Sequence, residues 1–136
     1  MDAIAAQGGS GGVGENVGQH NERFNSYSGT DANIIQGSGD YNHVENNKNT
    51  ITNGSYNHVG GYNNTVIGAS SSFVHGIANT SYQSLSYSAI IGNNNTVNSA
   101  YGTLVVGGDH YIAPIGGSDI NALVCGQFAD TRLLSI

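Results

Sequence analysis

Histidine is the residue type in this chain with the clearest potential for chemistry. The chain has five histidines, and two of them, His43 and His58, each follow a Tyr-Asn pair and precede a valine. On neighbouring stacked strands such residues would lie about 5 Å apart, close enough to share a metal ion. We find no cysteine or acidic residue with zinc-site spacing beside them, so the sequence favours a hydrogen-bonded polar stripe, with a metal site at His43 and His58 as the alternative. No cofactor is predicted.

Acidic residues are the next group that could support a reaction. A glycosidase needs two carboxyl groups about 5 to 9 Å apart in a groove. The acidic residues of the region that we expect to be ordered show no recurring or paired positions; they are Asp31, Asp40, Glu45, Asp109, Asp119 and Asp130. The sequence also shows no nucleophile elbow and no glycine-rich phosphate loop. We therefore predict no catalytic residues and a protein that is not an enzyme; the alternative is a phage polysaccharide depolymerase with its active site between chains.

Tyrosine could recognise a sugar or a protein, because its ring combines an apolar face with a polar hydroxyl. The tyrosines that we expect on the surface are Tyr27, Tyr41, Tyr56, Tyr62, Tyr82 and Tyr87. Packing against the protein's own surface is the favoured role. If some of them bind a receptor, we expect the site at the irregular segment 82–85, because it interrupts an otherwise uniform surface. The predicted contact residues are Tyr62, Tyr82, Gln83 and Tyr87.

These residues are positioned by a repeat that covers most of the chain. Its best copy is residues 54–67, with Val59 two positions before an anchor glycine, Gly61. The anchor positions are 46, 61, 76 and 92, about fifteen residues apart. A fixed period of this kind predicts a stack of similar coils. A Val or Ile stands two residues before each anchor and predicts a buried column; its members are Ile35, Val44, Val59, Val74, Ile90, Val105 and Val124.

An asparagine and a threonine follow the anchors and form two further columns. They are Asn49, Thr50, Asn64, Thr65, Asn79, Thr80, Asn95 and Thr96. The asparagine column favours a ladder of amides that bond to corner backbone groups over a sugar-binding ridge. The threonine column is only one residue wide, so an ice-binding solenoid is the lesser alternative function.

The repeat region is expected to consist of short strands joined by frequent corners. Val and Thr favour pleated backbone, whereas Gly and Asn tolerate the positive φ of tight corners. No segment shows apolar residues at helical spacing. We therefore predict an all-β fold, a parallel β-roll or β-solenoid, over residues 33–112. Residues 1–32 are interpreted as a glycine-rich flexible or capping segment, and residues 113–136 as a turn followed by an apolar strand.

Composition limits the partners. The net charge is −6 with only three Lys and Arg residues, which argues against nucleic acid and anionic membranes. No apolar run reaches the roughly twenty residues of a membrane span. The single cysteine, Cys125, stands in an apolar run and is expected to be a buried thiol.

Energetics predict that the chain associates with copies of itself. Ordering fifteen backbone units costs on the order of 15–30 kcal/mol, whereas two or three buried Val or Ile side chains contribute roughly 5–8 kcal/mol. The residues flanking the buried column become apolar toward the C-terminus, and a strand that is apolar on both faces needs cover on both. We therefore expect an obligate homo-oligomer with three-fold closure.

The motifs at residues 40–45 and 55–66 resemble the head repeats of trimeric autotransporter adhesins, and more closely the related repeats of bacteriophage tail fibres and appendages. The similarity covers roughly residues 33–112, although Asn46 replaces the anchor glycine and the insert 82–85 lengthens one coil. The resemblance implies a left-handed homotrimeric β-roll in a virion tail or, alternatively, on a bacterial surface. It also implies a structural and receptor-binding module that presents contacts to host-surface glycan or protein.

Overall fold

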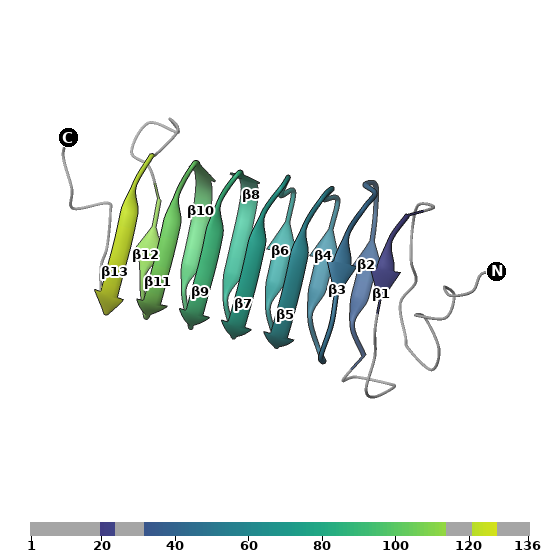
Figure 1. The fold of residues 1–136 in the computed structure, drawn as a ribbon, viewed down its shortest axis with the longest axis horizontal. Coiled ribbons are helices and arrows are strands. Elements are labelled where there is room, and N and C mark those ends of the chain that lie inside the picture. The colour runs from purple at the N-terminus through teal and green to yellow at the C-terminus, as the bar shows by residue number, and fades with distance from the viewer. Residues whose placement is uncertain (1–19, 24–31, 114–120, 128–136) are drawn as a thin grey trace.

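The chain winds into a stack of flat β-coils (Figure 1). The computed structural model describes residues 20–23, 32–113 and 121–127. One sheet, here called the odd sheet, contains β1 (Glu22–Arg23), β3 (His43–Val44), β5 (His58–Tyr62), β7 (Phe73–Ile77), β9 (Ala89–Asn93), β11 (Leu104–Gly108) and β13 (Leu123–Gln127). The other, the even sheet, contains β2 (Ile34–Gln36), β4 (Thr50–Thr52), β6 (Thr65–Ile67), β8 (Thr80–Ser86), β10 (Thr96–Tyr101) and β12 (Tyr111–Ile112).

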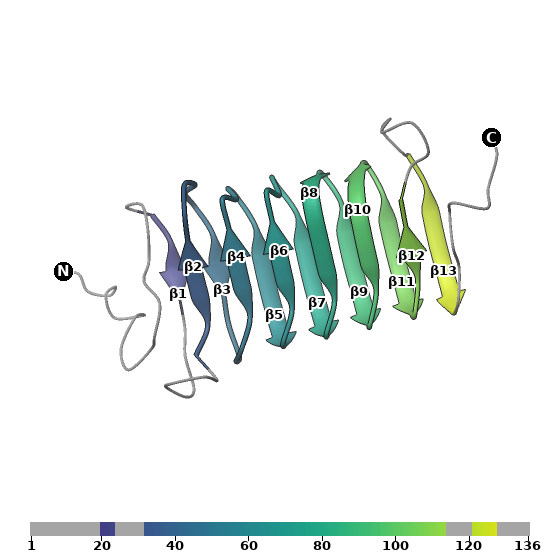
Figure 2. The same cartoon turned by 180° about the vertical axis from the view of Figure 1, so that it is seen from behind.

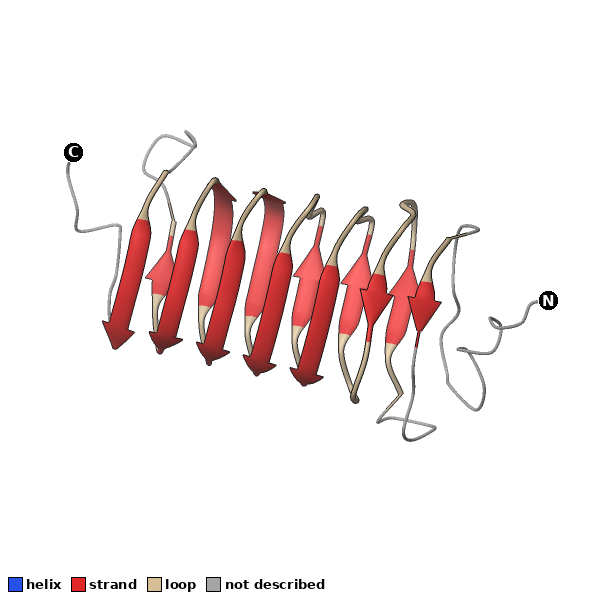
Figure 3. Cartoon of the chain, in the orientation of Figure 1, coloured by secondary structure: helices blue, strands red, loops and turns tan. Residues whose placement is uncertain are grey.

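All neighbouring strands within each sheet are parallel, and each pairs with the strand two places along the chain. One coil therefore consists of one odd and one even strand joined by two corners, as Figure 3 shows. Odd strands run down the near side of Figure 1 and even strands run up the far side, so the chain winds in a left-handed sense; the reverse view in Figure 2 agrees. The prediction of an all-β parallel solenoid is confirmed. No helix able to cross a membrane occurs in the described residues.

Alternation along each strand places the core between the two sheets. The odd sheet contributes Val44, Val59, Val74, Ile90, Val105 and Val124 to the interior. The even sheet contributes Ile35, Ile51, Val66, Val97 and Ile112. The sequence analysis placed Ile35 in the same column as Val44. This was wrong, because Ile35 lies in the even sheet and pairs with Ile51.

The anchor glycines turn the chain at the end of each odd strand. Gly76 has φ of 133°, a conformation that residues with a Cβ rarely adopt. A Cβ built on it would also overlap the carbonyl oxygen of Gly92 in the next coil. Asn46 occupies the anchor place of its coil with φ of 66°, and its side chain accepts a hydrogen bond from the backbone N–H of Gly61 at 3.0 Å. Asparagine can thus replace glycine at this anchor, because a φ in the left-handed region is one that asparagine tolerates.

Buried asparagines line one corner of the stack and continue from coil to coil. The column comprises Asn33, Asn49, Asn64, Asn79 and Asn95, each fully buried. From Asn49 onward, the Nδ2 of each donates to Oδ1 of the asparagine before it, at 2.9–3.2 Å. A second, shorter ladder of Asn21, Asn42 and Asn57 occupies the opposite corner. These ladders supply partners for backbone groups that the tight corners would otherwise leave buried and unpaired.

Three side chains differ from the sequence expectations. Arg23 of β1 takes the core position next to Val44, so the stack already includes residues inside the segment 1–32. Leu85, assigned to an insert, is fully buried and pairs with Ala100 at a β-bulge. Cys125 is exposed, because its neighbour Val124 takes the inward position and strand alternation turns the thiol outward.

Candidate functional site

A column of tyrosines lies at the corner that precedes the odd strands. Tyr41, Tyr56 and Tyr87 occupy equivalent corner positions with φ between 50° and 60°. The rings of Tyr41 and Tyr56 stack with centroids 5.0 Å apart and an interplanar angle of 4°. The His20 ring extends the stack beyond Tyr41, at 4.3 Å. The rings of His20, Tyr41 and Tyr56 therefore stack on one another in successive coils at this corner.

Ser71 interrupts this row. It occupies the coil between Tyr56 and Tyr87, with the same backbone conformation and φ of 56°. At roughly 4.8 Å per coil, the two tyrosines are about 10 Å apart along the stack. Their side chains are 60% and 64% exposed. Tyr87 makes an edge contact with Tyr101 on its other side, at 5.3 Å. The missing ring leaves an open position in an otherwise regular aromatic column.

A groove of about 860 Å³ runs along this corner. One wall consists of the tyrosine column, and the other consists of the first residues of the odd strands, where Phe73 and Leu104 are exposed. The buried hydroxyls of Ser72 and Ser88 in its floor donate to backbone carbonyls. The exposed Ser71 hydroxyl makes no hydrogen bond within the described part of the chain. The groove therefore offers aromatic faces and the uncommitted hydroxyl of Ser71.

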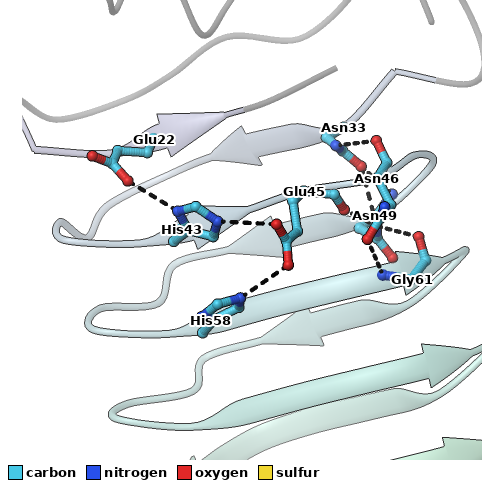
Figure 4. Close-up of polar contacts among 8 residues, drawn as sticks. All are labelled: Glu22, Asn33, His43, Glu45, Asn46, Asn49, His58 and Gly61. Atoms are coloured by element: carbon cyan, nitrogen blue, oxygen red, sulfur yellow. Dashed lines mark hydrogen bonds and ion pairs between the residues drawn. The ribbon is translucent and has the colours of Figure 1, made fainter. Parts of the chain in front are cut away.

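A histidine and glutamate cluster lies on the outer face of the odd sheet, at its N-terminal end (Figure 4). His43 and His58 are paired across β3 and β5, as the sequence pattern predicted. Glu45 points between them: Oε2 lies 3.5 Å from Nε2 of His43, and Oε1 lies 3.3 Å from Nε2 of His58. Glu22 lies on the other side of His43, 2.9 Å from its Nδ1. The sequence analysis found no acidic residue placed to join the histidines, and the structure corrects this.

The electrostatics of this cluster follow from its crowding. Hydrogen bonds with His58 and then His43 hold the pKa of the Glu45 carboxyl below its usual value. His75 lies beyond His58, with ring centroids 4.8 Å apart, and its ring covers Gly60, which has no side chain to exclude it. Burial, and then the neighbouring His58, lower the pKa of the His75 imidazole. Its Nε2 is buried and has no hydrogen-bond partner among the described residues.

The two outer faces of the solenoid differ in chemistry. Beyond the cluster, the outer face of the odd sheet exposes Phe73, Ile91, Leu104 and Leu123. The outer face of the even sheet instead presents the half-buried threonine column of Thr50, Thr65, Thr80 and Thr96. The apolar surface is therefore concentrated on one side of the molecule.

The four residues predicted to contact a receptor do not form one site. Tyr62 lies at the far end of β5, where Lys48 sits over its ring at 5.7 Å. Tyr82 lies on the outer face of the even sheet. Tyr87 lines the groove with Tyr56. The side chain of Gln83 lies outside the described residues. The asparagine column is buried, so its amides are not available to a sugar.

Comparison with known proteins adds no relative. No family model, no curated protein and no solved structure matches the chain. The likeness to adhesin and tail-fibre repeats therefore stays a prediction from the sequence.

Proposed function

We propose that this chain is a structural and receptor-binding module of a bacteriophage tail fibre or, alternatively, of a bacterial surface adhesin. In this proposal three copies form a rigid shaft or head that presents contacts to a host surface. The observation that carries the proposal is the unequal chemistry of the two outer faces. A parallel sheet that is apolar on both faces is normally covered on both, and the outer face of the odd sheet has no cover within the described chain.

Copies of the same chain are the cover that fits best. The exposed apolar residues continue in register from β7 to β13, so an identical straight surface can pack along their whole length. The polar even face then remains in water. Closure by three copies is taken from the resemblance to trimeric head repeats. Burying this face offsets the small core of each coil.

The groove beside the tyrosine column supports the receptor-binding part of the proposal. Stacked rings have centroids about 4.5 to 7 Å apart, so one further ring fits between Tyr56 and Tyr87. A pyranose ring has apolar C–H faces for the two tyrosines and hydroxyls for the free Ser71 side chain. We therefore assign host-surface glycan as the ligand class, with a protein receptor as the outcome if glycans fail to bind.

A glycan array with the full-length chain tests this assignment. Binding of a defined class of glycan is expected, with a loss of at least tenfold in affinity for Tyr56→Ala and for Tyr87→Ala. The matched control is Tyr62→Ala, which removes an exposed tyrosine at another corner. Ser71→Tyr is the sharpest variant, because three tyrosines already occupy equivalent positions with similar φ. It should complete the aromatic column, keep or raise the melting temperature, and abolish glycan binding; unchanged binding would contradict the groove assignment.

A further inference from the structure

We propose that His43, Glu45 and His58 form a binding site for a divalent transition-metal ion, with Zn²⁺ as the expected occupant. The site is complete within one chain. His43 and His58 also line the N-terminal end of the groove, but the metal proposal does not require that a glycan binds there. Each residue offers one ligand atom, and the three atoms lie within 4.8 Å of one another. Two imidazoles and a carboxylate are a ligand set that suits zinc and related ions.

The ligand atoms are close enough for one ion to gather them. Zinc binds nitrogen and carboxylate oxygen at about 2.0–2.2 Å, so ligand atoms at the corners of a tetrahedron lie roughly 3.3–3.5 Å apart. The two oxygens of Glu45 face one histidine each: Oε2 lies 3.5 Å from Nε2 of His43, and Oε1 lies 3.3 Å from Nε2 of His58. One ligand atom from each residue lies within 4.8 Å of the other two, so rotation of the three side chains would bring them to a single ion. A fourth position remains open to solvent, because the three side chains are 30–43% exposed.

Glu22 orients the ring of His43 for this role. An ionised carboxylate can only accept hydrogen bonds, so Nδ1 of His43 carries the proton in its 2.9 Å contact with Glu22. In a neutral ring Nε2 then bears a lone pair, and this lone pair faces an oxygen of Glu45 (Figure 4). A cation between the two atoms makes the contact attractive. With an ion bound there, Glu22, His43 and the metal would form a carboxylate, histidine and metal triad.

The ligands come from rigid neighbouring elements. His43 and Glu45 flank the buried Val44, and His58 is the partner of His43 on β5. Glu22 comes from β1, the first strand of the odd sheet. A bound ion would therefore join β3 to β5 directly, and β1 would be linked to it through the contact between Glu22 and His43. The ion would lie at the N-terminal end of the outer face of the odd sheet, where polar residues replace the exposed apolar ones. We therefore expect it to stabilise the N-terminal coils.

The experiment uses the untagged full-length chain, stripped of metal with a chelator and titrated with Zn²⁺ by calorimetry near neutral pH. One Zn²⁺ per chain is expected. His43→Gln and His58→Gln should each weaken binding at least a hundredfold, and Glu22→Gln about tenfold. His20→Gln is the matched control, because His20 also pairs with a carboxylate, Asp40 at 3.1 Å, but has no second imidazole; its affinity should not change.

Two further measurements keep a folding defect from being mistaken for loss of the site. Circular dichroism of each variant without metal should match that of the parent chain. Co²⁺ in place of Zn²⁺ should give the visible bands of a low-coordinate nitrogen and oxygen site, absent in folded His58→Gln. Zn²⁺ should also raise the melting temperature of the parent chain and not of that variant. Sub-stoichiometric binding, or binding that survives both histidine substitutions, would overturn the proposal.

Discussion

Asn64 donates twice to the side chain of Asn49: its backbone N–H and its Nδ2 both reach Oδ1 at 2.9 Å. The same Nδ2 also donates to the carbonyls of Gly60 and Gly76, at 2.9 Å each. Its own Oδ1 accepts from the backbone N–H of Asn79 at 3.0 Å. One buried side chain thus satisfies groups in three consecutive coils. The asparagine column is part of the fold's hydrogen-bond framework.

Asn64→Ala is therefore expected to destabilise the chain by about 2–4 kcal/mol, because it leaves several buried backbone groups unpaired. Asn64→Asp should cost at least as much, since its second carboxyl oxygen would face Oδ1 of Asn49 and the carbonyls of Gly60 and Gly76 in a fully buried position. Thr65→Ala, one residue away on the half-buried outer face, serves as the control and should change stability by less than about 1 kcal/mol. Denaturant unfolding measures all three. Equal stability of Asn64→Ala and Thr65→Ala would show that the ladder is not needed.

Gly76→Ala tests the close approach of successive coils. The added Cβ would overlap the carbonyl oxygen of Gly92 and would also hold an unfavourable φ. We expect a loss of about 3 kcal/mol or more, or failure to fold. Gly126 has a comparable positive φ of 97° but no described atom within 4 Å of a built Cβ. Gly126→Ala should therefore cost only the backbone strain, about 1–2 kcal/mol, and the difference between the two variants isolates the steric clash.

The contact between Asp40 and His20 predicts that the N-terminal end of the stack is sensitive to acid. Its pKa is lowered from the ordinary value of 3.8, chiefly because it accepts a hydrogen bond from the backbone N–H of His20. A carboxyl group whose pKa falls on folding contributes stability above its unfolded pKa and loses it as the pH drops through the folded value. Pairing of β1 should therefore loosen as the pH falls below 3.8 and through the folded pKa.

Hydrogen exchange of the backbone amides of Glu22 and Arg23 measures this effect. Asp40→Asn should reduce their protection at neutral pH, whereas parent and variant should converge in strong acid. Because the Asp40 side chain is still 33% exposed, we expect a local change in protection and no large change in global stability. A difference between the two chains that persists below the folded pKa would rule out the proposed linkage.

Much of this architecture was accessible from the sequence because its period is short. Residues one repeat apart become neighbours, so spacing alone correctly paired His43 with His58 and Val59 with Val74. Ile35 was assigned to the wrong sheet because glycines end strands on both sides of a coil, and Gly37 also has a positive φ of 77°. The spacing of residues along the sequence does not distinguish the corners that end odd strands from those that end even strands.

The side-chain clusters were harder to predict for physical reasons. Glu45 reaches both histidines because it follows His43 by two residues on the same outer face and His58 lies beside His43 in the next coil. The open position at Ser71 can be recognised only when the tyrosine corners of successive coils are aligned. The equivalent residue of the next coil is Tyr87, sixteen rather than fifteen residues later, because β8 contains an extra residue. Cys125 was misplaced because apolar character alone does not reveal which face of a strand a residue occupies.

The proposed interface predicts a sharp contrast between the two outer faces. Leu104→Asp places a charge in the middle of the exposed apolar column of the odd sheet and should break the assembly into single chains. Thr65→Asp makes the same change in charge on the even face and should leave the assembly intact. Light scattering coupled to size exclusion distinguishes the outcomes. Intact assemblies for Leu104→Asp, together with dissociation by Thr65→Asp, would place the interface on the opposite face.

The most direct test of the account is the mass of the unmodified chain in solution. Sedimentation equilibrium at micromolar concentration should give a single species of three times the chain mass of 14.0 kDa, because the exposed face of the odd sheet is then buried between copies. A stable, folded and monodisperse species of 14.0 kDa would contradict it, since the apolar face would then be shown to need no partner.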